Sequence, residues 1–135
     1  MIKNIDHIGI VVRSTESAVT IFRDLFGFEV LESLVAAEQG FKSTLISKGM
    51  AKVELIEPIT SDGPIARFLE KRGEGLHHIS LLVDDVEQAV SSLRAKGVQL
   101  IGEEPEQVTE TAKSIFIHPR SASGILFELV QRSDV

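Results

Sequence analysis

Two histidines and two glutamates stand at corresponding places in the two halves of the sequence. Their imidazole nitrogens and carboxylate oxygens suit Mn²⁺, Co²⁺, Ni²⁺, Zn²⁺ or Mg²⁺ and leave coordination positions for a substrate. The chain contains no cysteine, so a thiolate zinc site and a cysteine nucleophile are excluded. We therefore predict one divalent metal ion per site, held by His7, Glu54, His78 and Glu128.

An internal repeat underlies this correspondence. Residues 5–12 match residues 76–83 at an offset of 71, which aligns the two histidines. Three residues of slippage later, residues 53–55 match residues 127–129, which aligns the two glutamates. The repeat predicts one domain made of two fused modules. We expect the domain to span 1–135, with modules at about 5–59 and 76–130.

Strand alternation predicts where these side chains point, because successive residues of a strand face opposite sides of a sheet. In the first strand, Ile8, Ile10 and Val12 share the larger apolar face, and His7 lies on the other. His78, Glu54 and Glu128 are likewise opposite their apolar neighbours. We expect all four to project from the face that the helices leave uncovered.

Each module reads as βαβββ, which predicts an α+β fold. The first helix should begin at Ser14-Thr15 and end at Gly27. In the second helix, Asp84 and Glu87 are spaced like a capping box, and Gly97 marks the end. A connecting helix is expected at about 62–73. The further strands are expected at about 28–34, 42–48, 51–57, 98–103, 113–118 and 124–130.

Composition excludes several functions. The net charge is −6 and no basic cluster is longer than Lys71-Arg72, which argues against nucleic acid as a partner. No apolar run approaches the roughly 18 residues that span a bilayer, so we expect no membrane segment and a cytoplasmic location. The absence of tyrosine excludes a tyrosine general acid.

The doubled pattern with His and Glu on strands resembles the vicinal oxygen chelate superfamily, which includes glyoxalases, bleomycin resistance proteins and dioxygenases. Within it, the chain is most similar to the methylmalonyl-CoA epimerase family. The connecting-helix stretch that ends in the His pair and the His-Pro-Arg stretch are the parts most particular to that family. The matching stretches are 5–10, 38–40, 53–58, 64–78, 118–120 and 124–129.

The resemblance implies a cupped, eight-stranded mixed sheet with helices on its outer face, and it implies a homodimer. It makes His7, His78 and Glu128 metal ligands and puts Glu54 at the fourth ligand position. The implied reaction is epimerisation at C2 of methylmalonyl-CoA, or of a close 2-alkylmalonyl-CoA, through a metal-stabilised enolate.

One position departs from the pattern of the family. Ser43 stands where some members have a glutamate that is taken as a proton-transfer group. A serine hydroxyl is a poor unassisted base, so Glu128 or a water molecule on the metal becomes the candidate on one face, and the second base is left open. We also expect Ser43 to contact substrate.

Binding an anionic acyl-CoA requires local positive charge in this acidic chain. The cations closest to the expected site are Lys42, Lys113 and Arg120, which we predict to contact substrate phosphate or carboxylate groups. Solvated strand-end charges are the alternative for all three.

Two other functions use the same scaffold. A glyoxalase I-like lactoylglutathione lyase would employ the same ligand set and a related enediolate. A binding or resistance module would sequester a small molecule without chemistry, although the intact ligand set argues against it.

Overall fold

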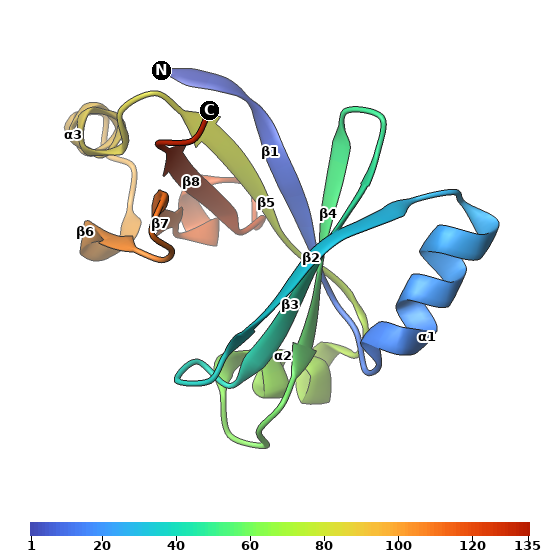
Figure 1. Cartoon of the computed structure of the whole chain (residues 1–135). Coiled ribbons are helices and arrows are strands. Elements are labelled where there is room, and N and C mark those ends of the chain that lie inside the picture. The colour runs from blue at the N-terminus through green and yellow to red at the C-terminus, as the bar shows by residue number, and fades with distance from the viewer. The chain divides into compact units, whose positions relative to one another are not determined.

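The computed structural model describes all 135 residues, Met1–Val135. The chain forms two compact units. One is continuous, His7–His77, and the other combines Met1–Asp6 with His78–Val135. The first six residues are therefore grouped with the second half of the chain, and Figure 1 shows the chain coloured by residue number.

The His7–His77 unit contains the end of strand β1 (Ile2–Val11) and three further strands. Strand β1 pairs in parallel with β4, and β3 pairs antiparallel with both of its neighbours. The strand order in this unit is β2-β3-β4-β1. The added strands are β2 (Glu29–Ala36), β3 (Phe41–Lys48) and β4 (Ala51–Pro58).

The second unit repeats this plan in the order β5-β8-β7-β6. Strands β5 and β8 are parallel, and β7 is antiparallel to both neighbours. The structure therefore confirms the eight-stranded mixed sheet. The strands are β5 (Gly75–Val83), β6 (Leu100–Gln107), β7 (Ala112–Ile117) and β8 (Phe127–Arg132).

The strand register reproduces the sequence repeat residue by residue. In one unit Gly9 is the β1 partner of Glu54, and in the other Ser80 is the β5 partner of Glu128. Since His7 and His78 each precede those partners by two residues, both histidines share a face with the corresponding glutamate. The strand pairs Gly9–Glu54 and Ser80–Glu128 thus correspond to each other, although the histidine strands repeat at an offset of 71 and the glutamate strands repeat three residues later.

Three helices connect the strands, and their termini carry the expected signals. Helix α1 (Thr15–Val19) starts at Ser14, whose side chain accepts a hydrogen bond from Ser17 N, and continues as a π-helical segment, Thr20–Leu25. Gly27 follows at φ +77°, a conformation that glycine adopts without steric cost. Helix α2 (Pro64–Arg72) is the expected connecting helix.

The cap of helix α3 (Val86–Ala95) corrects one prediction. We expected Asp84 to begin this helix, but Asp85 is the N-cap and accepts a hydrogen bond from Gln88 N. The shift of one residue removes the capping-box spacing from Glu87, whose carboxylate instead pairs with Lys113. The predicted end is correct, with Gly97 at φ +84° just after the helix.

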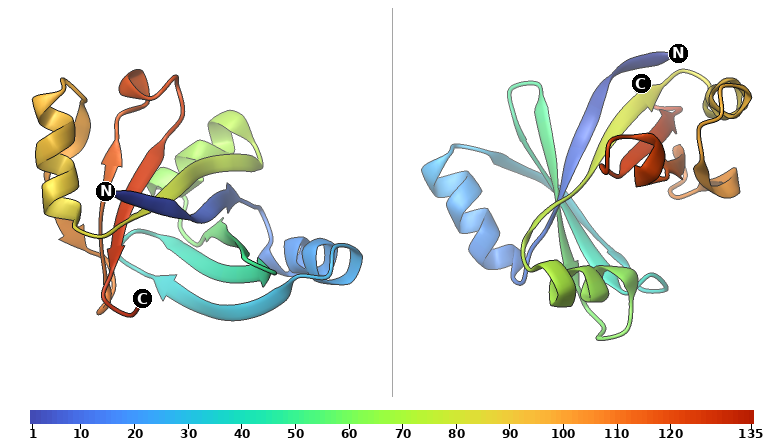
Figure 2. Two further views of the ribbon diagram at one scale, coloured as in Figure 1. Left: turned by 90° about the horizontal axis from the view of Figure 1, so that it is seen from above. Right: turned by 180° about the vertical axis from the view of Figure 1, so that it is seen from behind.

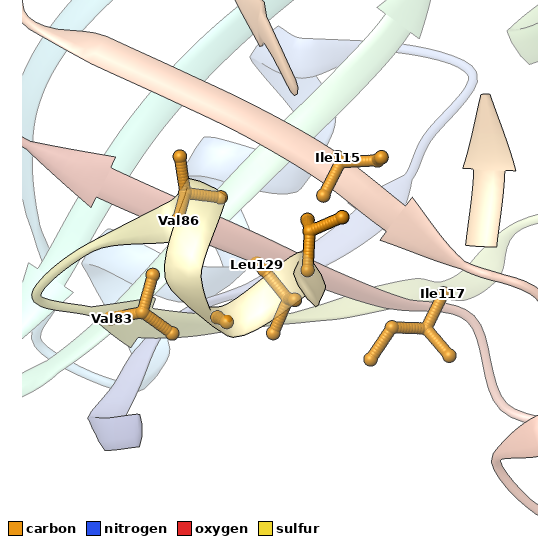
Figure 3. Packing of buried hydrophobic residues seen from close by; sticks show 7 residues of the cluster. Val83, Val86, Ile115, Ile117 and Leu129 are labelled. Atoms are coloured by element: carbon orange, nitrogen blue, oxygen red, sulfur yellow. The ribbon is translucent and has the colours of Figure 1, made fainter. Parts of the chain in front are cut away.

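Helices α1 and α3 each pack against one face of the strands of their own unit. In the second unit, buried side chains of α3 meet those of β5, β7 and β8, and Figures 2 and 3 show the helix and this cluster. Leu129, at its centre, is fully buried, and burying such a side chain contributes about 2 kcal/mol. The cluster comprises Val83, Val86, Ala89, Val90, Ile115, Ile117 and Leu129.

The first unit has apolar clusters on both sides of its sheet. Helix α1 contributes Ala18 to the face that carries Val12 and Leu55. On the other face, Ile65 of α2 packs against Val11 and Ile56. The connecting helix therefore covers part of the face that carries His7. None of the helices is both long and apolar enough to cross a membrane.

Candidate functional site: two histidine–glutamate pairs

The first pair lies on neighbouring strands of the His7–His77 unit. His7 Nε2 is 3.3 Å from Glu54 Oε1. The other carboxylate oxygen, Oε2, accepts a hydrogen bond of 2.6 Å from Ser43 Oγ on β3. His7 and Ser43 are both buried, and the Glu54 side chain is 21% exposed. Glu54 is therefore held from two sides while part of its carboxylate is accessible.

The second pair has the same construction. His78 Nε2 is 3.9 Å from Glu128 Oε1, a distance that exceeds a hydrogen bond. The histidine ring meets the ring of Phe116 edge to face, with centroids 5.7 Å apart. Phe116 is the β7 register partner of Glu128, so all three residues occupy one face of the unit. The Glu128 side chain is 13% exposed.

The alternation that we predicted for these strands is confirmed within each unit. The helix-covered faces carry Leu55 and Leu129, and the adjacent residues Glu54 and Glu128 project from the opposite faces. In both pairs the histidine presents Nε2 to the Oε1 atom of the glutamate. Each unit thus brings one imidazole nitrogen close to one carboxylate oxygen.

These atoms fit a divalent metal ion by their chemistry. Imidazole nitrogens with carboxylate oxygens are ligands for borderline and hard divalent cations. His7, Glu54 and His78 offer one such ligand atom each. A further observation is the hydroxyl of Ser80, which is fully buried beside Glu128 and has no hydrogen-bond partner. Unpaired buried groups of this kind are rare, and a nearby bound ion is one of the explanations for them.

The histidine next to His78 has a different environment. The ring of His77 packs edge to face against Phe68 of α2, with centroids 4.9 Å apart. This contact lies within the His7–His77 unit and agrees with the repeat, which aligns His78 and not His77 with His7.

The two lysines that we predicted to bind substrate lie on other strand faces than the histidine–glutamate pairs. Lys113 makes a 2.8 Å ion pair with Glu87 of α3, and hydrogen bonding to this lysine lowers the pKa of the Glu87 carboxyl. Lys113 therefore lies on the helix-covered side, away from the face of His78 and Glu128. Lys42 pairs in register with Glu57 and alternates with Ser43, which puts it on the side of α1. Neither lysine therefore lies on the strand face of the predicted metal-ligating glutamate of its unit, Glu54 or Glu128.

Arg120 and Ser43 occupy other settings. Arg120 is exposed in the short 3-10 turn Pro119–Ser121, where its backbone N–H donates to His118 Nδ1 across 3.0 Å. Ser43 contacts Glu54 directly. Of the four predicted substrate contacts, Ser43 alone lies on a face that carries a predicted metal ligand, and Arg120 lies beyond the end of β7.

Sequence reasoning overlooked Ser80 and the pair formed by Asp6 and Arg132. Ser80 is a hydroxyl within a strand of apolar residues, at the place where the first module has Gly9. The difference between serine in one repeat and glycine in the other could have drawn attention to Ser80. Arg132 Nε and Nη2 bind the two carboxylate oxygens of Asp6 at 2.9 and 2.8 Å, and this bonding raises the pKa of the guanidinium. No local pattern links residues so far apart.

Comparison with known proteins identifies the class. Residues 6–117 match the Glyoxalase/Bleomycin resistance protein/Dioxygenase superfamily. The chain belongs to this superfamily, which confirms the resemblance based on its doubled βαβββ pattern.

Its relatives within the superfamily define the chemistry more closely. The ethylmalonyl-CoA/methylmalonyl-CoA epimerase of Cereibacter sphaeroides is 33% identical over 97% of this chain and 99% of its own. The uncharacterized protein YqjC of Bacillus subtilis is 39% identical over 94% of this chain and 91% of its own. A solved methylmalonyl-CoA epimerase in complex with methylmalonyl-CoA and NH4⁺ is 33% identical, with a TM-score of 0.92 over 100% of this chain and 98% of that one. The chain is accordingly an isomerase of the epimerase kind.

Proposed function

We propose that this enzyme epimerises methylmalonyl-CoA, or a close 2-alkylmalonyl-CoA, at C2, and that the reaction depends on one divalent metal ion. The observation that carries the proposal is the duplicated pair: each unit presents a histidine Nε2 and a glutamate Oε1 on the strand face opposite α1 or α3. The relatives named as acyl-CoA epimerases support the substrate class.

In this proposal the four predicted ligands share one task, which is to hold the metal ion. His7, Glu54, His78 and Glu128 would hold the ion, and the burial of both histidines restricts their ring positions. When bound, the ion supplies Lewis-acid stabilisation for the negative charge that develops on the thioester oxygen as the C2 proton leaves. Ser43 fixes one oxygen of Glu54 by its 2.6 Å hydrogen bond.

Proton transfer is assigned to Glu128. The Glu128 side chain is partly accessible and lies beside an imidazole, so its carboxylate can remove the C2 proton on one face of the substrate; inversion then requires a proton from the opposite face. Ser43 is excluded from this task as an unassisted base, and its contact with Glu54 gives it a positioning role. The group that serves the opposite face of C2 stays open.

Recognition of the CoA phosphates is assigned first to Arg120, because its guanidinium stands on an exposed turn. Lys113 would have to leave Glu87 to bind an anion, and Lys42 lies across from Glu57. We still propose that both lysines contact the substrate, at the edge of its binding site. The homodimer and the cytoplasmic location stay predictions.

Deuterium exchange tests the reaction directly. Methylmalonyl-CoA is incubated in D₂O with enzyme that has been loaded with Co²⁺ or stripped by a chelator, and C2 deuteration is followed by mass spectrometry. We expect exchange with the loaded enzyme, a loss of at least a hundredfold after stripping, and recovery when Co²⁺ is returned.

The matched controls separate the candidate functions. Ethylmalonyl-CoA reports the tolerance for the 2-alkyl group, and methylglyoxal with glutathione reports glyoxalase activity. Turnover of the second substrate without C2 exchange in the first would refute the epimerase assignment. The variant Glu128→Gln should bind acyl-CoA yet exchange at a small fraction of the wild-type rate.

A further inference from the structure

The side chain of Ser80 is a buried hydroxyl without an evident structural task. The residue is 0% exposed, and Oγ has no hydrogen-bond partner. Burying a polar group without a partner is unfavourable, and such groups are rare in folded proteins. An alanine would fill the same place on the strand without that cost. The hydroxyl therefore calls for a partner that is present only in the working state.

The register of β5 and β8 shows which residues surround this hydroxyl. Ser80 is the direct strand partner of Glu128, and it follows His78 by two residues, so the three side chains occupy one face. Neighbouring strands are about 4.8 Å apart, a distance that a serine and a glutamate side chain together span easily. The hydroxyl thus stands beside the second histidine–glutamate pair.

The first unit provides an internal comparison. There Glu54 has Gly9 as its β1 partner, and its carboxylate is held by Ser43 from the strand on the other side. In the second unit the β5 partner of Glu128 is itself a serine. The repeat aligns Ser43 with Ser114 on β7, so Ser80 has no serine counterpart in the first unit. It is an additional hydroxyl on the β5 side of Glu128, and its Oγ has no hydrogen-bond partner.

We propose that Ser80 is a positioning residue for Glu128: when a divalent ion binds one carboxylate oxygen, the Ser80 hydroxyl donates its hydrogen to the other. This inference rests on the metal centre of the proposed function and adds a residue to it. The hydrogen bond fixes the carboxylate plane and relieves the unpaired burial of Oγ in the same step. Outer hydrogen bonds of this kind change metal affinity by about 10- to 100-fold.

The test uses Co²⁺ as the probe and the full-length chain. Affinity is measured by calorimetric titration, and the ligand field is followed by the visible absorption of bound Co²⁺. Ser80→Ala should weaken Co²⁺ binding about tenfold or more and shift the absorption bands. The metal-free variant should melt no lower than the wild type, because an unpaired buried hydroxyl has been removed.

Thr15→Val is the matched control. Thr15 Oγ1 is the other buried side-chain oxygen without a partner, at the start of α1. This substitution should leave Co²⁺ affinity and spectrum unchanged. A Ser80→Ala protein with wild-type affinity and spectrum would overturn the role of Ser80 alone. Failure of the wild type to bind any divalent ion would overturn the metal centre and this inference together.

Discussion

Ser43 Oγ donates a 2.6 Å hydrogen bond to Glu54 Oε2, while the other oxygen of Glu54 faces His7 Nε2 at 3.3 Å. The serine stands at the position where some members of the resembled family have a proton-transfer glutamate, and it orients the carboxylate of Glu54, a proposed metal ligand. A hydroxyl at this point can restrict Glu54 without adding negative charge to the site. In the proposed mechanism, Ser43 therefore positions Glu54 and does not transfer the proton.

Replacement of Ser43 by alanine should loosen the Glu54 carboxylate. We expect divalent-metal affinity to fall about tenfold, because a hydrogen bond that orients a ligand has been lost. Calorimetric titration with Co²⁺ measures the change. Ser33→Ala is the control, since Ser33 makes a 2.9 Å hydrogen bond to Thr44 on the helix-covered side. Equal effects of the two substitutions would contradict the orienting role.

Metal binding should stabilise the fold in proportion to ligand concentration. An ion present at about 100 times its Kd raises the free energy of unfolding by about 2.7 kcal/mol. Melting curves should therefore shift upward with added Co²⁺ in the wild type and much less in His7→Ala and His78→Ala. His118→Ala, whose ring accepts from Arg120 N in a turn, should retain the shift. Retention of the full shift in both ligand variants would place the ion elsewhere.

The Asp6–Arg132 pair should contribute substantially to stability. The Asp6 side chain is only 7% exposed, and both of its oxygens accept from the guanidinium. Arg132→Ala leaves this carboxylate without its charged partner, at a cost of about 2–3 kcal/mol in the free energy of unfolding. Urea denaturation measures the loss. Arg23→Ala breaks an exposed pair with Asp24 and should unfold close to the wild-type midpoint.

The Lys113–Glu87 pair predicts a modest acid sensitivity. Lys113 lowers the pKa of Glu87 in the folded state. The pair therefore stabilises the protein above the ordinary pKa of a glutamate, and this contribution disappears as the pH falls through the lowered value. Glu87→Gln should reduce stability slightly at pH 7 and not at pH 2. The effect is small because both side chains are substantially exposed.

A double-mutant cycle supplies the control for that pair. Lys113→Met should cause the same small loss at pH 7, and adding Glu87→Gln should cause little more. Additive losses would show that the two residues act separately.

Sequence periodicity predicted the strands and the faces well because both modules obey the same alternation. Alternation along the strands puts His7 on the face of Glu54 and His78 on the face of Glu128. The repeat indicates which residues are equivalent in the two modules before the strand pairs are known. The cap of α3 was harder to predict, since Asp84 and Asp85 are chemically identical candidates. The extended backbone at Asp85 and the hydrogen bond that its side chain accepts from Gln88 N distinguish the two.

Contacts between distant residues set the limit of such reasoning. Alternation determines on which face Lys113 lies, but the proximity of Glu87 depends on how α3 packs across the strand. Ser80 illustrates a different limit, because a serine in an apolar strand has many satisfactory environments. Its importance follows from the absence of a partner, which is a property of the folded state.

The segment Met1–Asp6 precedes the whole His7–His77 unit in the chain and yet belongs to the other unit. Its contacts there include the Asp84 N–H bond to Met1 O and the pair with Arg132, which joins residues 126 positions apart. Closing so long a loop carries an entropic cost that local contacts avoid. During synthesis, the continuous unit can form as soon as it emerges, whereas its neighbour must wait for strand β8. We therefore expect folding in two kinetic steps, with docking of the first six residues in the slower one.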